Sequence, residues 1–206
     1  MRRRLRYLAP FLAFVAAGCA AVKPPVEPLK VLPPPLSLRA EASVEIDRTV
    51  PLIGRAVVLA QQPGSFRIEV LGPFGSAMAL ILSDGRTIYL LSGGKSKRYS
   101  REDPEVPYSF KPEEAVAFLT GNGPVASECG CEVSKDAYGR TSKVVKSENG
   151  TPVLTVTLAE YRAVDGAEVP FDIKIANKKE TLRIKYTAVE VNPVLETGFF
   201  SAEGLP

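Results

Sequence analysis

The most reactive side chains in this chain of 206 residues are its three cysteines, because it contains no histidine. Without an imidazole, Ser-His-Asp and Cys-His catalytic sites, HExxH zinc sites and His-ligated haem are excluded. Cys129 and Cys131 form a C-x-C pair, with neither a second cysteine pair nor a histidine to complete a metal site. In an oxidising compartment we expect them to form a local disulfide, to pair between molecules or to fasten their loop. We predict no metal and no cofactor.

The acidic and glycine-rich stretches do not form a catalytic motif either. Glu113 and Glu114 are adjacent in sequence, so on a helix they diverge instead of converging on one substrate. Glu102 and Asp103 precede a proline in a polar stretch that is typical of a solvated loop. Gly93-Gly94 lacks the spacing and the following helix of a phosphate-binding loop. We therefore predict that the protein is not an enzyme.

The N-terminus has the pattern of an exported protein. A basic stretch ending at Arg6 precedes an apolar run from Leu8 to Ala17, which is typical of a signal peptide. The run is shorter than the about 20 residues that span a bilayer as a helix. Ala16-Ala17-Gly18 before Cys19 resembles the lipobox of bacterial lipoproteins, which implies cleavage before this cysteine and its acylation, with palmitate among the chains. The alternative is ordinary secretory cleavage, with Cys19 incidental.

Removal of this leader changes the charge of the protein. The whole chain carries a formal charge of +3, and Arg2, Arg3, Arg4 and Arg6 lie in residues 1–18, which contain no Asp or Glu. Subtracting these four positive charges from +3 leaves −1, so the composition gives no reason to expect a nucleic-acid partner. With 45% hydrophobic and 24% charged residues, the remaining chain suits one globular domain, which we expect to be monomeric.

A proline-rich segment separates the cysteine from the rest of the chain. Prolines stand at positions 24, 25, 28, 33, 34 and 35, which favours an extended tether over a helix or strand. We assign residues 1–18 to a lipoprotein signal peptide, 19–37 to the lipidated cysteine and tether, and 38–206 to the folded domain. Ala20 follows the cysteine, and by resemblance to the enterobacterial sorting rule this implies an outer-membrane lipoprotein that faces the periplasm.

From Leu38 onward the apolar residues alternate with polar ones, as in half-buried strands. A helix is expected between Pro112 and the stop at Gly121, and a β-bulge near Ala188. About ten strands and one helix favour a strongly curved antiparallel sheet, an open half-barrel with the short helix over its concave face. A closed barrel or a two-sheet sandwich fits the same pattern. The expected strands are 38–47, 53–60, 66–71, 77–82, 87–91, 95–99, 132–133, 142–146, 153–161, 169–175 and 182–191.

Four stretches resemble one protein family. They are Phe66–Ser76, Lys111–Gly121, Val169–Ile173, and Leu182–Lys185 with Val191–Pro193 after it. Together they are similar to the LolB family of outer-membrane lipoprotein receptors and the wider LolA/LolB-like superfamily. The resemblance implies that the domain accepts acylated lipoproteins from a periplasmic carrier of LolA type and releases them into the outer membrane.

A carrier of this kind needs an apolar concavity, because each acyl CH₂ exposed to water costs about 0.8 kcal/mol. The expected inward positions could line such a cavity, and they could equally form a solid core. These positions are Val44, Ile46, Phe66, Ile68, Val70, Met78, Leu80, Leu82, Val116, Leu119, Leu154, Val156, Leu158, Phe171, Ile173, Leu182 and Ile184.

The turn Gly72-Pro73-Phe74-Gly75 presents an aromatic ring where polar residues are expected. Phe74 resembles the exposed apolar residue with which the LolB family delivers cargo to the membrane; alternatively its ring folds back over the sheet edge. Two other functions fit the same domain. One is a structural or adaptor lipoprotein that binds a protein partner, and the other is a carrier of another lipid.

Overall fold

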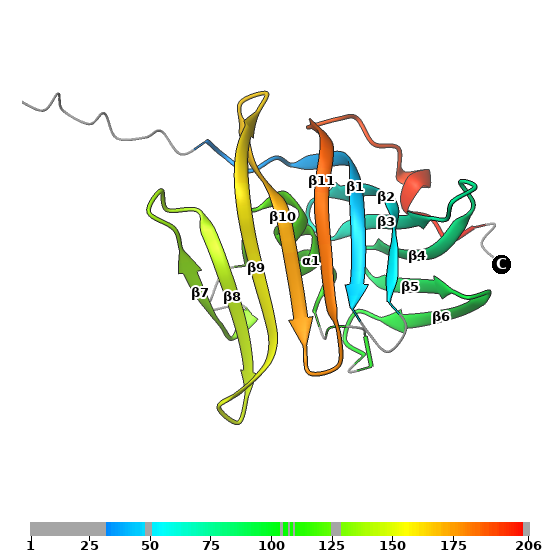
Figure 1. Ribbon diagram of the computed structural model, residues 1–206, viewed down its shortest axis with the longest axis horizontal. Coiled ribbons are helices and arrows are strands. Elements are labelled where there is room, and N and C mark those ends of the chain that lie inside the picture. The colour runs from blue at the N-terminus through cyan, green and yellow to red at the C-terminus, as the bar shows by residue number, and fades with distance from the viewer. Residues whose placement is uncertain are drawn as a thin grey trace, which may run out of the picture.

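In the residues that the structure describes, eleven strands form one antiparallel sheet and helix α1 lies against it (Figure 1). The computed structural model describes residues 32–47, 51–103, 105, 106, 108, 110–124 and 129–203. The expected signal peptide, Cys19 and most of the tether lie outside these residues. The strands are β1 (Ser37–Asp47), β2 (Leu52–Gln61), β3 (Ser65–Leu71), β4 (Ala77–Asp84), β5 (Thr87–Ser92), β6 (Lys95–Ser100), β7 (Cys131–Lys135), β8 (Thr141–Glu148), β9 (Thr151–Val164), β10 (Ala167–Asn177) and β11 (Thr181–Val191).

The sheet consists of two meanders that join at its centre. Strands β1 to β6 form one and β7 to β11 the other, and β1 pairs with β11, with Val44 opposite Ile184. Strands β6 and β7 are therefore the two opposite edges, and no described residues pair them. This arrangement confirms the curved open sheet and excludes the closed barrel and the sandwich.

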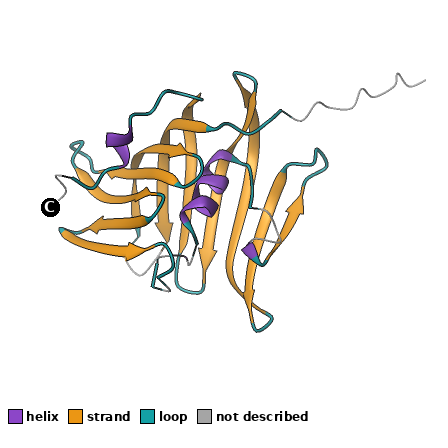
Figure 2. Ribbon diagram, turned by 180° about the vertical axis from the view of Figure 1, so that it is seen from behind, coloured by secondary structure: helices purple, strands orange, loops and turns teal. Residues whose placement is uncertain are grey.

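The chain must cross the whole sheet between β6 and β7, and this crossing contains α1 (Pro112–Thr120). Figure 2 shows the helix in front of the concave face. The backbone N–H of Lys111 donates to the Glu114 carboxylate at 2.9 Å, which satisfies one free donor at the helix start. Gly121 ends the helix at φ 80°, a left-handed conformation that a residue with a Cβ adopts only with strain. Among the described residues no helix is long and apolar enough to cross a membrane.

The core consists of the apolar residues that alternate with polar ones along the strands. In β1, Leu38, Ala40, Ala42 and Val44 are buried and the residues between them are exposed. The expected β-bulge is confirmed, because Glu41 pairs with Ala188 and Ala42 with Tyr186, which leaves Thr187 without an opposite residue.

The C-terminal segment covers part of the other face of the sheet. It contains the 3₁₀ helix η2 (Thr197–Phe200), and its Leu195 and Phe200 pack with Leu59, Leu80 and Leu82 in a second apolar cluster. Strand β4 is therefore apolar on both faces, and apolar residues alone could not indicate which set faces inward.

The inward positions of β4 differ from those expected. Ala79 lies opposite Val70 and Ile81 opposite Ile68, so these two β4 residues share the concave face with β3. Met78, Leu80 and Leu82, which were expected on that face, belong to the opposite set. The register shift between Val70 and Leu71 and the cover that the C-terminal segment provides account for this correction.

Candidate lipid-binding pocket

A pocket of about 190 Å³ lies on the concave face, between strands β1 to β5, the β10–β11 end and helix α1. Its wall is almost entirely apolar. Glu180 supplies its one carboxylate among the described residues, and no described lysine or arginine lines it. The lining residues are Val44, Ile46, Leu52, Phe66, Ile68, Val70, Ala79, Leu80, Ile81, Leu90, Ser92, Tyr108, Phe110, Ala115, Phe118, Leu119, Ile175, Glu180, Leu182 and Ile184.

The concave face is divided into a filled half and an open half. On the β8–β10 side, inward residues such as Val156 and Ile173 have no exposed surface. On the pocket side, Ile46, Ile68 and Leu182 have the same apolar character but remain only partly buried. Large aliphatic side chains that face inward without filling the space form a surface suited to an apolar guest.

Aromatic rings close the side of the pocket beneath the helix. The rings of Tyr108 and Phe110 stack with centroids 6.1 Å apart, and Phe110 meets Phe118 of α1 edge-on at 6.2 Å. Tyr108 and Phe110 precede the helix in the chain. The cover of the pocket therefore consists of α1 together with these two residues.

Three polar contacts attach α1 to the other half of the sheet. The Lys146 ammonium of β8 lies 2.6 Å from the Glu114 carboxylate. The Tyr186 hydroxyl donates to the Leu119 carbonyl at 3.0 Å. The Tyr161 hydroxyl, which donates to the Thr141 carbonyl at 2.7 Å, also lies 3.4 Å from the Gly121 carbonyl. Burial raises the pKa of both tyrosines above the usual value, so their hydroxyls remain protonated donors.

The pocket reaches the end of the sheet where four turns lie. Ile46 pairs with both Leu52 and Leu182 at the β1–β2 and β10–β11 ends. Ala79 pairs with Ser92, next to the β3–β4 and β5–β6 turns. The β3–β4 turn contains Gly72 to Ser76, so Phe74 lies at the same end of the strands as this part of the pocket.

Phe74 is 97% exposed, in agreement with the first of the two conformations considered for it. The backbone N–H of Gly75 donates to the Gly72 carbonyl at 3.0 Å, and the N–H of Gly72 donates to the Ser76 carbonyl at 2.8 Å. Gly75 has φ 79°, a value that favours glycine. These contacts hold the turn while the ring points into solvent. Ile53, 73% exposed on β2, adds a second apolar side chain near this turn because Arg55 pairs with Leu71.

The structure separates the expected cavity residues into three groups. Those in the pocket wall are Val44, Ile46, Phe66, Ile68, Val70, Leu119, Leu182 and Ile184, with Leu80, whose side chain also packs in the outer cluster. Those in the filled half are Val116, Leu154, Val156, Leu158, Phe171 and Ile173. Met78, 37% exposed, and Leu82 lie on the outer side. Phe171 meets Tyr186 edge-on and lies beneath the Arg162 guanidinium.

Several wall residues were not expected from the sequence. Ala79, Ile81 and Leu90 were missed because β4 and β5 are apolar on both faces, although cross-strand pairing with Ile68 and Val70 identifies the first two. Tyr108 and Phe110 lie in a stretch of sequence without a periodic apolar pattern. Glu180, in the β10–β11 turn, is a polar turn residue by pattern alone.

The two remaining cysteines lie away from this pocket. Cys129 and Cys131 form a disulfide at the start of β7. Among the described residues, no group of three or more His, Cys, Asp or Glu side chains could hold a metal ion.

Three solved structures share this architecture at low sequence identity. A LolA-superfamily protein from Nitrosomonas europaea is 14% identical, with TM-score 0.54 over 83% of this chain and 92% of that one. A domain from Vibrio parahaemolyticus named for outer-membrane lipoprotein sorting is 15% identical, with TM-score 0.52 over 80% and 88%. This chain has the LolA-type fold. A DUF1329 family protein from Desulfovibrio piger ATCC 29098 is 11% identical, with TM-score 0.51 over 84% and 92%.

Comparisons of sequence alone find less. No family model matches the chain. No curated protein matches it either.

Proposed function

We propose that this protein is a lipid-anchored carrier that accepts the acyl chains of lipoproteins in the concave pocket and releases them into the outer membrane. The apolar pocket beneath α1 is the observation that carries the proposal. Its partly buried wall residues, Ile46, Ile68 and Leu182, are inward-facing side chains that an acyl chain would cover. Each CH₂ that moves from water into this wall gains about 0.8 kcal/mol.

The pocket volume sets how much cargo this conformation holds. An apolar cavity of about 150 Å³ stays dry and binds a benzene-sized guest. The pocket, at about 190 Å³, therefore accommodates part of one acyl chain. A triacylated cargo requires more room, which displacement of α1 and of the Tyr108 and Phe110 side chains would provide.

The exposed Phe74 supplies a means of release. Its ring lies at the same strand end as Ala79 and Ser92 of the pocket wall. Insertion of a phenylalanine into lipid gains roughly 1.5–3 kcal/mol, which favours local contact without anchoring the protein by itself. In this proposal the acyl groups on Cys19 supply the permanent anchor, and a periplasmic carrier of LolA type supplies the cargo.

The same pocket also supports a carrier of another lipid. The volume of about 190 Å³ favours this second function, because a lipid with one or two chains needs a smaller opening than a triacylated protein does.

Mass spectrometry of the protein purified without detergent tests the acyl-binding role. The protein is exported with a cleavable secretory signal peptide in place of residues 1–19, so that it carries no acyl groups of its own. We expect a co-purifying acylated lipoprotein or lipid. A protein that is consistently free of both, and that takes up no acyl probe, would contradict the proposal.

A further inference from the structure

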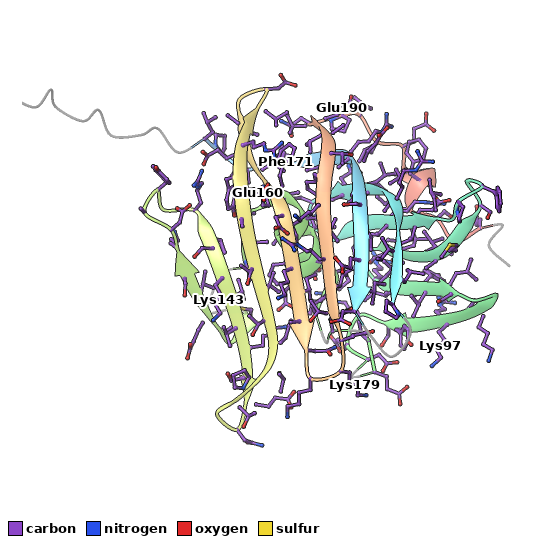
Figure 3. The ribbon with its side chains drawn as sticks, viewed as in Figure 1. Lys97, Lys143, Glu160, Phe171, Lys179 and Glu190 are labelled. Atoms are coloured by element: carbon purple, nitrogen blue, oxygen red, sulfur yellow. A yellow bond between two sulfur atoms is a disulfide. The ribbon has the colours of Figure 1, made fainter. Side chains whose placement is uncertain are left out.

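Edge strand β6 places two lysines beside the pocket wall. Lys97 lies opposite Leu90 and Lys95 lies opposite Ser92 across the β5–β6 pair. Leu90 and Ser92 both line the pocket. Residues directly opposite each other in antiparallel strands project to the same face, with Cβ atoms about 5 Å apart. Lys95 and Lys97 therefore extend along the pocket side of the sheet edge. Figure 3 labels Lys97 at edge strand β6.

A neighbouring pair of residues supports this assignment of faces. Tyr99 of β6 lies opposite Ile88, and both are buried in a cluster that also contacts Ile81 and Leu90 of the pocket wall. Lys97 and Tyr99 are two residues apart on one strand, so they share a face. Arg98 points to the other side, where its guanidinium lies 5.4 Å from the centre of the Tyr89 ring.

Both lysines are exposed, and among the described residues neither forms an ion pair. Glu180, the carboxylate of the pocket wall, comes from the β10–β11 turn, on the other half of the sheet. The border of the pocket along β6 is therefore positive, whereas at the β10–β11 turn the Glu180 carboxylate follows Lys178 and Lys179 in the sequence. An anionic group attached to a chain bound beside Leu90 and Ser92 is attracted to the β6 lysines.

We propose that the pocket accepts a phospholipid, whose phosphate is bound by Lys95 and Lys97 while its acyl chain occupies the wall beside Leu90 and Ser92. This inference rests on the acyl-binding pocket of the proposed function and specifies the lipid of its second form, the carrier of another lipid. Lysines on an edge strand also discourage pairing with other chains. That role does not distinguish a phosphate-bearing ligand from a neutral one, so the two explanations predict different binding data.

Calorimetric titration of the full folded domain with two single-chain probes tests the proposal. The probes are lysophosphatidylglycerol and a monoacylglycerol of the same chain length, both below their micelle concentrations. We expect the phosphate-bearing probe to bind about tenfold more tightly at low salt, because two exposed charge pairs each contribute modestly. Added salt should reduce this difference.

Variants identify the residues responsible. K95Q/K97Q should bind both probes with the affinity of the neutral one, whereas K143Q/K174Q, which removes two exposed lysines from β8 and β10, should behave as the wild type. Equal affinity of the wild type for both probes would overturn the phosphate assignment and leave the acyl pocket intact. Failure to bind either probe would overturn the acyl-binding function itself. Complete displacement of the lipid by millimolar inorganic phosphate would show an anion site that is independent of the acyl chain, and would also overturn the assignment.

Discussion

The Lys146 ammonium lies 2.6 Å from the Glu114 carboxylate, and this contact joins helix α1 to strand β8. Both side chains are largely buried, with exposed fractions of 17% and 7%. None of the described residues of strand β8 lines the pocket. The contact therefore ties α1, which packs against β2, β3 and β10, to the filled side of the concave face.

The ion pair makes a prediction about stability. K146M should lower the free energy of unfolding by about 3 kcal/mol, because it leaves the Glu114 carboxylate buried without its cation. E114Q/K146M should recover part of this loss, since an amide oxygen can still accept the Lys111 N–H. Equilibrium urea unfolding measures both variants. A double variant no more stable than K146M would show that the unpaired charge is not the cause.

Phe74 is predicted to act in release and not in folding. F74E should change the free energy of unfolding by no more than about 0.5 kcal/mol, because the side chain is fully exposed. Transfer of acylated cargo to liposomes should fall, since a carboxylate opposes entry into hydrocarbon. V194E is the matched control, because Val194 is 94% exposed and lies outside the β3–β4 turn. Equal transfer by F74E and V194E would remove the delivery role.

Movement of α1 is predicted to be necessary for large cargo. A Cβ at Gly64 would lie 3.1 Å from the Cβ of Pro112 at the helix start, close to the about 3.5–4.5 Å found in disulfides. Oxidised G64C/P112C should therefore fix the helix to the β2–β3 turn. It should bind a single-chain probe but exclude a triacylated lipopeptide, as measured by calorimetry.

Reduction of the cross-link should restore binding of the lipopeptide. The single variants G64C and P112C, treated in the same way, control for reduction of the native Cys129–Cys131 disulfide. Uptake of the lipopeptide by the oxidised double variant would show that this end of the helix stays in place during binding.

The lipid anchor is predicted to depend on Cys19. C19A should yield an unprocessed or soluble protein, because acyl chains supply nearly all of the expected membrane affinity. Membrane fractionation and incorporation of labelled palmitate measure this. Equal palmitate incorporation by C19A and the wild type would remove the lipoprotein assignment.

Much of the sheet could be predicted from the sequence, because strands such as β1 bury one face and expose the other. Apolar and polar residues therefore alternate along these strands. The helix was predictable because Pro112 and Gly121 mark its ends through local backbone chemistry. The inward face of β4 was not, since Leu195 and Phe200 from the distant C-terminus cover its outer side.

The sequence predicted an apolar concave face, but it did not predict where on that face the pocket lies. Its position depends on long-range contacts that no local pattern encodes. The Lys146–Glu114 pair joins residues 32 positions apart. Tyr108 and Phe110 contribute to the wall from a stretch of sequence without a periodic apolar pattern.

The acyl content of an Ala79→Phe variant tests the central claim most directly. Ala79 is a small, partly buried residue in the pocket wall, so a phenylalanine there would occupy the space of the cargo without displacing the core. Ala163→Phe makes the same change at an exposed position of β9. Both proteins are purified without acyl groups of their own, and bound acyl compounds are quantified by mass spectrometry. The account predicts that Ala79→Phe loses most of the bound acyl material while Ala163→Phe retains the wild-type amount; equal amounts in a folded Ala79→Phe protein would contradict it.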